Sequence, residues 1–417
     1  MNLIKTAFLF PGLLLLNQSA FAQLYIDGGK TRHRFAQMHL GLELKTFPFQ
    51  GQNQSQTTNG QWIDSNFSGP TEAKIIMGGT HFWGHADFYI SFPIVRAGND
   101  QFSTGVETAA RIYPWALKKD KIRPFAGFGH LPTGFNQADG AKAVRQKLFI
   151  STGFSFQKGN HLFDLNASYI TRPSLDYYYA RNHIAKTQMS PVSIGIGYRY
   201  LFDTTVSAEE NWQSGRTKTI TDTLASRKRL NGFTISVGPS VAFHLNRSDR
   251  MQNEFAYLDR PGSSGVFVDA GVGYYWHKPD LQVNLAYRST KAGQSAYDYS
   301  QSLRRSSLAL ESYVFFADYH GFAPFAGLAA GYEWLNVSEK SNGEEVNSGQ
   351  FRGIKPGLVF GWDIRPNRIQ SFYLRTNLRW FPNLKVNMAD GGQVNLDQLE
   401  VNFIQLVVFP GRMFPQF

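Results

Sequence analysis

The pattern that comes closest to a catalytic motif is Gly238-Pro239-Ser240-Val241-Ala242. It approximates the Gly-x-Ser-x-Gly turn that exposes a nucleophilic serine between a strand and a helix. Here the pattern lies inside an alternating segment, and no helix pattern follows it. Ser240 and His244 share a parity, so they face the same side of that segment. Because membrane hydrolases can use a serine and a histidine, a membrane lipid hydrolase remains a minor alternative. We interpret both as polar filler and expect no catalytic residue and no enzyme.

Other chemistry-bearing motifs are absent. The sequence has no His-Glu-x-x-His, phosphate-loop, dinucleotide-binding or EF-hand pattern. Its histidines show no metal-ligand spacing, and a cysteine count of 0 excludes disulfides and thiolate metal sites. The net charge of +11 is spread along the chain, with Arg227-Lys228-Arg229 as the only tight run. We therefore expect no metal, no cofactor and no nucleic-acid partner, and assign the charge to a solvated or headgroup-facing surface.

A set of charged residues recurs at one parity of alternating segments, on the side predicted to face inward. In a wide barrel such residues would line a channel and bias which ions pass. In a narrow barrel they must pair, because isolated buried charge is costly. The set comprises Glu107, Arg111, Asp164, Arg199, Asp269, Arg288, Glu311, Glu333, Arg375 and Arg379.

The elements that would position these charges are alternating strands, and Gly321 to Val337 is the clearest example. Phe322, Leu328 and Trp334 lie on one parity, while small residues and Glu333 lie on the other. A soluble sandwich turns its large apolar side chains inward. A membrane barrel turns them toward lipid, keeps small and polar residues inside and places aromatics at the interfaces. The aromatic end of this segment favours the membrane barrel.

The first residues predict export from the cytoplasm. Lys5 supplies a positive region, an apolar stretch follows, and Ala20-Phe21-Ala22 forms a cleavage site, so residues 1–22 are predicted to be a signal peptide cleaved after Ala22. No later stretch has 18 or more apolar residues, which argues against a helical membrane protein. The predicted location is the outer membrane of a Gram-negative-type bacterium.

About sixteen alternating segments of about ten residues follow the signal peptide. Predicted connections alternate between short periplasmic turns and long external loops, as in outer-membrane barrels. The segments 292–304 and 336–348 are among the predicted long loops. Tryptophans at strand ends are predicted to form the girdles at the two membrane interfaces: Trp83, Trp115, Trp276, Trp334 and Trp380.

The two halves of the chain match each other. Arg123-Pro124-Phe125-Ala126-Gly127 recurs as Ala323-Pro324-Phe325-Ala326-Gly327, which indicates duplication of a unit of about eight strands. The predicted organisation is a signal peptide (1–22), a first repeat (23–203), a linker (204–229) and a second repeat (230–417). Strands of the type PFAGFG and GVGYYW behind a signal peptide resemble the outer-membrane β-barrel domains related to OmpA and OmpX. The resemblance implies outer-membrane lipids and the barrel-assembly machinery as partners, with Phe417 similar to the C-terminal assembly signal.

Two all-β architectures follow from the duplication. The preferred one is a single transmembrane antiparallel barrel of about 16 strands with a water-filled lumen, which predicts porin-like passage of small hydrophilic solutes. The alternative is two tandem eight-strand barrels filled with side chains, which predicts a non-conducting structural or adhesion protein. The sequence specifies neither the solute nor the oligomeric state.

Overall fold

The chain is described here by a computed structural model. It describes residues 34–56, 61–98, 101–136, 142–203, 222–245, 248–258, 265–319, 321–365 and 372–413. The predicted signal peptide and most of the predicted linker lie outside these ranges. No helix within them has the length and apolarity needed to cross a membrane.

The first half of the chain forms a ring of eight antiparallel strands, called barrel 1. Neighbouring strands pair in sequence around the ring, and the ring closes because β1 pairs with β13 and β8 pairs with β9. The short strand β6 (Phe102–Thr104) pairs with β8, while the hairpins β2–β3 (Gln50–Gln56 and Trp62–Ser68) and β11–β12 (Ser174–Ala180 and His183–Gln188) lie in the connections. The ring strands are β1 (Gln37–Thr46), β4 (Thr71–His81), β5 (Ala86–Ala97), β7 (Glu107–Ile112), β8 (Lys121–Asn136), β9 (Lys142–Lys158), β10 (His161–Ile170) and β13 (Val192–Asp203).

The second half forms a closed barrel of its own, called barrel 2. Pairing of β14 with β21 closes the ring. A short helix, α4 (Asp249–Asn253), lies in the connection after β14, and α5 (Pro410–Met413) follows the last strand. The strands are β14 (Gly232–His244), β15 (Phe267–Trp276), β16 (Leu281–Ala296), β17 (Tyr299–Phe315), β18 (Phe322–Ser341), β19 (Glu344–Ile364), β20 (Phe372–Asn387) and β21 (Gln393–Val408).

The alternation of each strand separates an apolar exterior from a polar interior. In β18, Leu328 is 68% exposed on the outside, whereas Glu333 is fully buried inside. In β1, Leu40, Leu42 and Leu44 face outward, and the residues between them face inward. An exterior of this kind around closed rings is the arrangement of a membrane barrel. The predicted all-β barrel fold and its eight-strand unit are confirmed.

Of the two predicted architectures, the structure has the tandem pair and not the single barrel of about 16 strands. The decisive contacts join residues far apart in sequence: β1 pairs with β13 in the first half, and β14 pairs with β21 in the second. Each ring therefore closes through strands of its own half, and within the described ranges no strand pairs with a strand of the other half. The preference for one wide ring was wrong for this reason.

Two predicted external loops are also corrected, because they are strands. Residues 292–304 belong mostly to β16 and β17, which pair up to Ala296 and Tyr299. Residues 336–348 likewise extend β18 and β19 up to a two-residue turn at Asn342-Gly343. Both turn residues have positive φ, as a tight hairpin between right-twisted strands requires. These strands are polar on their outward side near the tips, which made the segments resemble loops.

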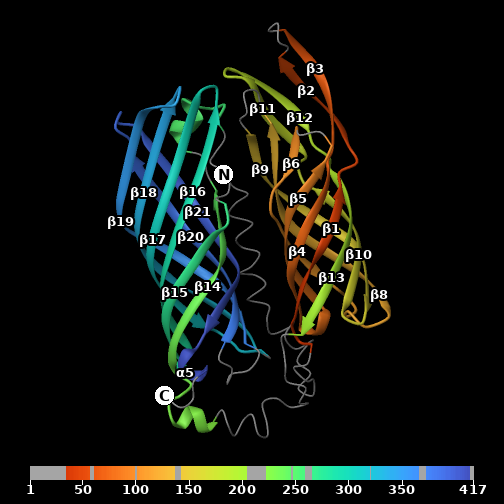
Figure 1. Ribbon diagram of the computed structural model, residues 1–417, viewed down its shortest axis with the longest axis vertical. Helices are drawn as coiled ribbons and strands as arrows, with labels where there is room; N and C mark the ends of the chain where they lie inside the picture. Colours follow the sequence, from red (N-terminus) through yellow and green to blue (C-terminus); the bar gives the residue numbers. More distant parts are fainter. Residues whose placement is uncertain are drawn as a thin grey trace.

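The two barrels stand side by side with their strands running in a similar direction (Figure 1). One apolar cluster joins Ile90 and Phe92 of barrel 1 to Val241, Phe243 and Phe403 of barrel 2. Val241 and Phe243 are nearly buried, although their parity is the outward one, because barrel 1 covers them. The outward face of part of β14 therefore contacts protein instead of lipid.

A second apolar cluster joins the barrels at the opposite end of the strands, where the short turns lie. Trp83, in the 3-10 turn η1 (Phe82–Gly84), and Phe35 of barrel 1 pack against Tyr319 of barrel 2. Leu374 of β20 packs against the same cluster. The contact thus extends along much of the height of both barrels, which gives the pair a defined shared face.

Candidate functional site: the barrel interiors and the outer loops

All ten charged residues predicted to face inward lie buried inside the barrels. Each belongs to a strand whose opposite parity is apolar, so the alternation alone directs it to the interior. They contact one another and further buried charges that the sequence had not singled out. Barrel 1 contains Glu107, Arg111, Asp164 and Arg199, and barrel 2 contains Asp269, Arg288, Glu311, Glu333, Arg375 and Arg379.

The middle of barrel 1 holds an ion-pair network centred on Arg199. Its guanidinium lies 2.6 Å from Asp87 Oδ2 and 2.6 Å from Asp164 Oδ2, so it bridges two carboxylates from different strands. His39 Nε2 lies 2.7 Å from the other oxygen of Asp87. Arg111 approaches Asp164 to 3.5 Å, and its guanidinium lies over the ring of Phe125. Both signs of charge are therefore matched at this level.

A second network lies above the first, toward the outer loops of barrel 1. Glu107 Oε2 accepts from Lys45 Nζ at 2.7 Å and from Lys74 Nζ at 3.3 Å. Its other oxygen accepts from the hydroxyl of Tyr89 at 3.1 Å. Lys74 also lies 3.5 Å from Glu72, so the cation is shared between two carboxylates. Both lysine side chains and both carboxylates are buried.

Barrel 2 has an equivalent arrangement built mainly from arginines. Arg379 donates to Asp269 at 2.6 Å and lies 2.6 Å from Glu311, which also accepts from Arg288 at 2.6 Å. The network continues upward because Arg288 lies 2.8 Å from Glu400.

Two further arginine pairs fill the interior of barrel 2 above and below that centre. Arg305 makes a double hydrogen bond to Glu333 at 2.7 and 2.8 Å. Arg375 binds both oxygens of Asp363 at 2.7 and 2.9 Å and donates to Gln282 at 2.8 Å. Fork-to-fork contacts of this kind are the strong, geometrically specific form of ion pair.

These networks fill the lumen at the heights where they lie. Removing a charge from water costs several kcal/mol, and a buried charge is tolerated only with close partners of opposite sign. Distances of 2.6 to 2.8 Å between the main charged groups leave no room for a water molecule between them. Eight-strand barrels are also just wide enough for side chains to fill. The arrangement can hold the walls of each barrel together.

Apolar layers cap both networks on the side of the outer loops. In barrel 1, Phe47, Phe135 and Phe149 pack with Leu175 and Tyr177 of the β11–β12 hairpin. In barrel 2 the layer is built from strand residues of inward parity together with Met388, which follows β20. They include Leu303, Leu335, Val337, Phe381, Leu384, Val386, Val394 and Leu396.

Sequence reasoning missed several network members. Arg305 was missed because 292–304 was interpreted as a loop, which placed the start of the next strand after it. Glu72 and Lys74 share the inward parity of β4, and Glu400 shares that of β21, so strict parity counting over the full strands would have found them. Which cation meets which carboxylate depends on barrel closure, and no local signal encodes it.

The weak catalytic pattern does not form a serine–histidine pair. Ser240 Oγ donates to Asp269 Oδ2 at 3.4 Å, inside barrel 2. His244 is buried on the same face of β14. Four residues of strand separate their Cα atoms by about 13 Å, which is too far for a direct hydrogen bond. No cluster of three or more His, Asp or Glu suited to a metal ion occurs in the described ranges.

The predicted girdle tryptophans lie in different surroundings, and Trp334 and Trp380 lie within β18 and β20 and not at the strand ends. Trp115 is exposed just beyond β7. Trp276 packs edge-on against Tyr274, and Trp334 packs edge-on against Tyr332, each at 4.8 Å between ring centres. Trp380 is half-buried at the last paired position of β20 with β19. Trp83 instead contacts barrel 2.

The outer loops of the two barrels contact each other through aromatic and arginine side chains. Arg181, between β11 and β12, donates to the carbonyl oxygen of Tyr297 and lies over the rings of Tyr257 and Tyr297 at 5.8 and 5.3 Å. Tyr178 packs against the same group of residues. The run Tyr177-Tyr178-Tyr179 therefore packs within the outer connections.

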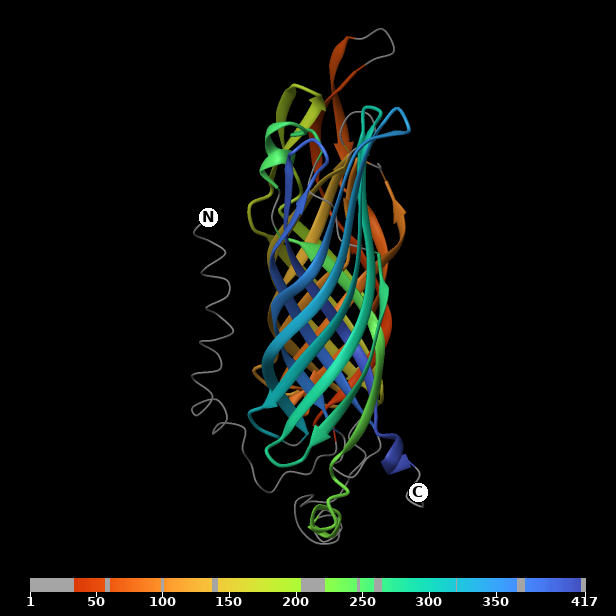
Figure 2. The same ribbon diagram turned by 90° about the vertical axis from the view of Figure 1, so that its left-hand side faces the viewer.

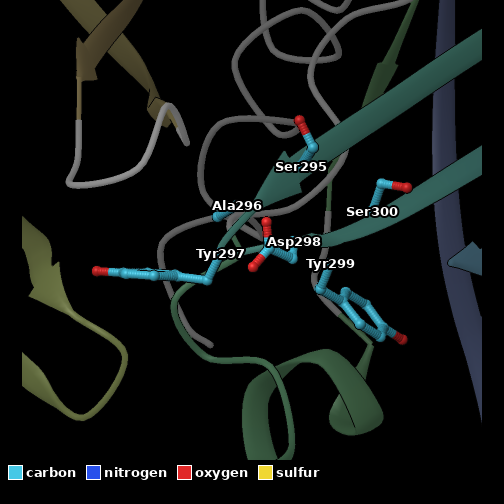
Figure 3. A pocket seen from close by; sticks show the side chains of 6 residues that line it. All are labelled: Ser295, Ala296, Tyr297, Asp298, Tyr299 and Ser300. Atoms are coloured by element: carbon cyan, nitrogen blue, oxygen red, sulfur yellow. The ribbon is translucent and has the colours of Figure 1, made fainter. Parts of the chain in front are cut away.

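A shallow hollow of about 310 Å³ lies at the β16–β17 turn, lined by residues 295–300. Figure 3 shows Tyr297 and Tyr299 pointing in opposite directions from this turn. Tyr299 stacks on Phe255 at 4.2 Å, which anchors the α4 connection. Burial raises the pKa of the Tyr299 hydroxyl, so the group stays protonated and neutral.

A salt-bridge cluster holds α4 onto the strand tips. Arg250 lies 3.0 Å from Glu339 of β18 and 2.7 Å from Asp390, beyond β20. Burial opposes the charged form of Arg250, but hydrogen bonds and charge from Glu339 and Asp390 outweigh it and raise its pKa. The backbone N–H of Gly392 and the Arg250 guanidinium lower the pKa of Asp390. The α4 connection and the strand tips that it contacts thus form an ordered layer above barrel 2, which we call the crown.

No family model and no curated protein matches the chain. Among solved structures, Neisserial surface protein A is similar at 17% identity, covering 43% of this chain and 97% of that one, with a TM-score of 0.31. Ail, the attachment invasion locus protein of Yersinia pestis, is similar at 15% identity, covering 42% and 98%, with a TM-score of 0.27. An outer membrane channel from Pseudomonas putida F1 is similar at 10% identity, covering 89% and 94%, with a TM-score of 0.20.

At these identities and scores the likeness concerns the fold alone. The fold itself rests on the strand pairings of the chain, which form two eight-strand rings. The predicted resemblance to OmpA- and OmpX-type barrels is confirmed at that level, in two copies.

Proposed function

We propose that the protein is a non-conducting outer-membrane barrel pair with a structural or adhesion role, and not an enzyme. The observation that carries the proposal is the filling of both interiors by paired charges. In barrel 2, Arg379, Asp269 and Glu311 meet at 2.6 Å with side chains that have no exposed surface. A passage for hydrophilic solutes would need water at this level, and these contacts favour a solid interior.

The ordered outer loops support a role at the outer face. The β2–β3 and β11–β12 hairpins stand above barrel 1, and the extended strands β16 to β19 stand above barrel 2 (Figure 1). The Arg181 contact with Tyr257 and Tyr297 joins the two sets. A joined outer surface of this kind suits attachment to another macromolecule or cell component.

Conductance of the complete mature chain in planar bilayers tests the proposal. We expect an electrically silent membrane, with insertion verified by the heat-modifiable gel mobility typical of folded barrels. Reproducible current steps would overturn the proposal and favour porin-like passage of small hydrophilic solutes.

A further inference from the structure

The wall of barrel 2 contains an interrupted ladder between β19 and β20. The two strands pair from Ile364↔Leu374 up to Leu358↔Trp380, and they meet again only at the isolated bridge Gly349↔Met388. Between these points residues 350–357 and 381–387, all within the described ranges, have no cross-strand partners in each other. We call this stretch the β19–β20 seam.

Two prolines and a β-bulge lie where the ladder stops. The bulge shifts the register of β20 between Phe381 and Leu384, and Asn383 within it has positive φ. Continuing the register one step beyond the pair Leu358↔Trp380 on the same face places Pro356 opposite Pro382. Neither residue has a backbone N–H, so neither can donate a hydrogen bond to the neighbouring strand at this position. Lys355 Nζ donates to the carbonyl oxygen of Asn383 at 3.3 Å across the seam. A side-chain contact thus takes the place of backbone pairing in this part of the wall.

The interior behind the seam is mostly apolar, unlike the ionic interior below it, although Lys355 shares the inward parity of β19 and its Nζ lies 4.9 Å from the ring centre of Phe351. Leu335, Leu384, Val386 and Leu396 lie there, all nearly or fully buried. Phe381 forms the floor of this layer, and the guanidinium of Arg305 lies 4.6 Å beneath its ring centre. A packed apolar layer with a charged floor therefore lies directly behind the seam.

The exterior of the seam has the order of groups expected at a membrane boundary. Leu358 and Ile354 of β19 face outward, and Ile354 is 71% exposed. Arg352, one outward step nearer the tip, and Lys385 on β20 flank the seam as exposed cations. In the described part of the chain neither has an ion-pair partner. Apolar residues followed by cations match a lipid tail followed by its phosphate headgroup.

The seam opens away from the other barrel. Figure 2 looks onto the side of barrel 2 that is turned away from barrel 1, where β19 lies in front. In barrel 1, the unpaired outer part of β5 is covered by barrel 2, because Phe92 packs against Phe403 at 6.5 Å between ring centres. The β19–β20 seam has no such cover among the described residues and is accessible to membrane lipid.

We propose that the β19–β20 seam binds a phosphate-bearing lipid of the leaflet from which the outer loops emerge. One acyl chain passes through the seam into the apolar layer of Leu335, Val386 and Leu396. The phosphate is held outside by Arg352 and Lys385. The proposal rests on the membrane embedding that the proposed function also assumes, but it does not depend on the absence of conductance.

Photolabelling of the complete mature chain in phosphatidylcholine vesicles tests the proposal. The probe is phosphatidic acid with a diazirine near the end of one acyl chain, and mass spectrometry locates the labelled residues. We expect labels on the inward residues Leu335, Val386 and Leu396. Labels confined to outward residues such as Ile354 and Leu358 would overturn the proposal, because they mark ordinary surrounding lipid.

Two variants and one matched control separate the parts of the site. Pro356→Val with Pro382→Val restores two N–H donors, so the strands can pair and inward labelling is expected to disappear. Arg352→Ala with Lys385→Ala is expected to lower inward labelling at least about tenfold. The control, Lys291→Ala with Arg304→Ala, removes two exposed cations of the same barrel that lie away from the seam and leaves inward labelling unchanged.

A second probe tests the headgroup. Diacylglycerol with the same diazirine chain lacks the phosphate and is expected to label the inward residues much less than phosphatidic acid. Equal labelling by both probes would overturn the role of Arg352 and Lys385. Folding of every variant is checked by heat-modifiable mobility. Conductance is measured on the same preparations, so that a failure of lipid binding at the seam can be told apart from a failure of the proposed non-conducting function.

Discussion

The buried arginines of both barrels hold carboxylates of different strands together. Arg379 bridges Asp269 and Glu311 at 2.6 Å each, inside a wall of hydrogen-bonded strands. A buried pair contributes little beyond what well-packed apolar residues of the same volume would give, but removing one partner leaves the other charge uncompensated. Replacing one charged residue of a network should therefore lower the free energy of unfolding more than replacing all of its charged residues together by apolar ones.

Arg379→Met is expected to lower the free energy of unfolding by about 3–5 kcal/mol, because Asp269 and Glu311 lose a cation that solvent cannot replace. Urea unfolding of the chain folded in detergent measures the change. The matched control Arg304→Met removes an exposed outward arginine and is expected to change stability by less than about 0.5 kcal/mol. Equal stability of the two variants would contradict the structural role of the network.

The crown above barrel 2 should loosen in acid. The pKa of Asp390 is lowered in the folded loop, so its contribution is present above the ordinary value of 3.8 and is lost as pH falls through the lower folded value. Hydrogen exchange of residues 248–258 is expected to accelerate over that range. Asp390→Asn should remove the part of the acid response that comes from its contact with Arg250. An unchanged response in Asp390→Asn would argue against this contact.

At the scale of the strand, period-2 alternation was enough to predict the sides of β1, β14 and β18, because one face of a barrel strand is uniformly apolar. The alternation did not predict that the tips of β16 to β19 are strands, because these tips rise beyond the apolar zone and their outward side becomes polar. It also could not predict that part of β14 is covered by protein, since a face that contacts another barrel has the same composition as one that contacts lipid.

Leu328→Arg tests whether the outward face of β18 meets hydrocarbon. An arginine near the middle of a bilayer destabilises a membrane barrel by about 2–4 kcal/mol, whereas it would be tolerated on a water-exposed surface. Unfolding in lipid vesicles measures the difference. The control Val346→Arg, also outward but near the tip of β19, should cost at most about 1 kcal/mol. A neutral Leu328→Arg would place this face in water.

At the scale of the molecule, the choice between one ring and two could not be derived from the sequence. Both architectures use the same strands with the same sides, and they differ only in whether β14 pairs with β21 or with a strand of the first half. That choice is a contact between residues more than 150 positions apart, such as Ile235 with Val408. The duplication indicated two equal units without specifying how each one closes.

Residues 23–203 and 230–417 are expected to fold as separate barrels when expressed apart, because each ring satisfies its own strand edges. Each half should show heat-modifiable mobility, but with a lower unfolding temperature than the whole chain, since Ile90, Phe243 and Phe403 lose their shared cluster. Failure of both halves to fold alone, with the complete chain folding normally, would contradict two independent rings.

The joining of two rings on one polypeptide has a consequence for any target at the outer face. Two copies of one barrel on separate chains would have to find each other by diffusion, and dilution would part them. Here the tether fixes the ratio at one to one and keeps the local concentration of each partner high, so a contact too weak to hold free subunits is sufficient. The outer loops of the two barrels, which differ in sequence, are thereby presented at a constant spacing. A ligand that contacts the outer loops of both barrels can gain affinity without any single loop binding it tightly.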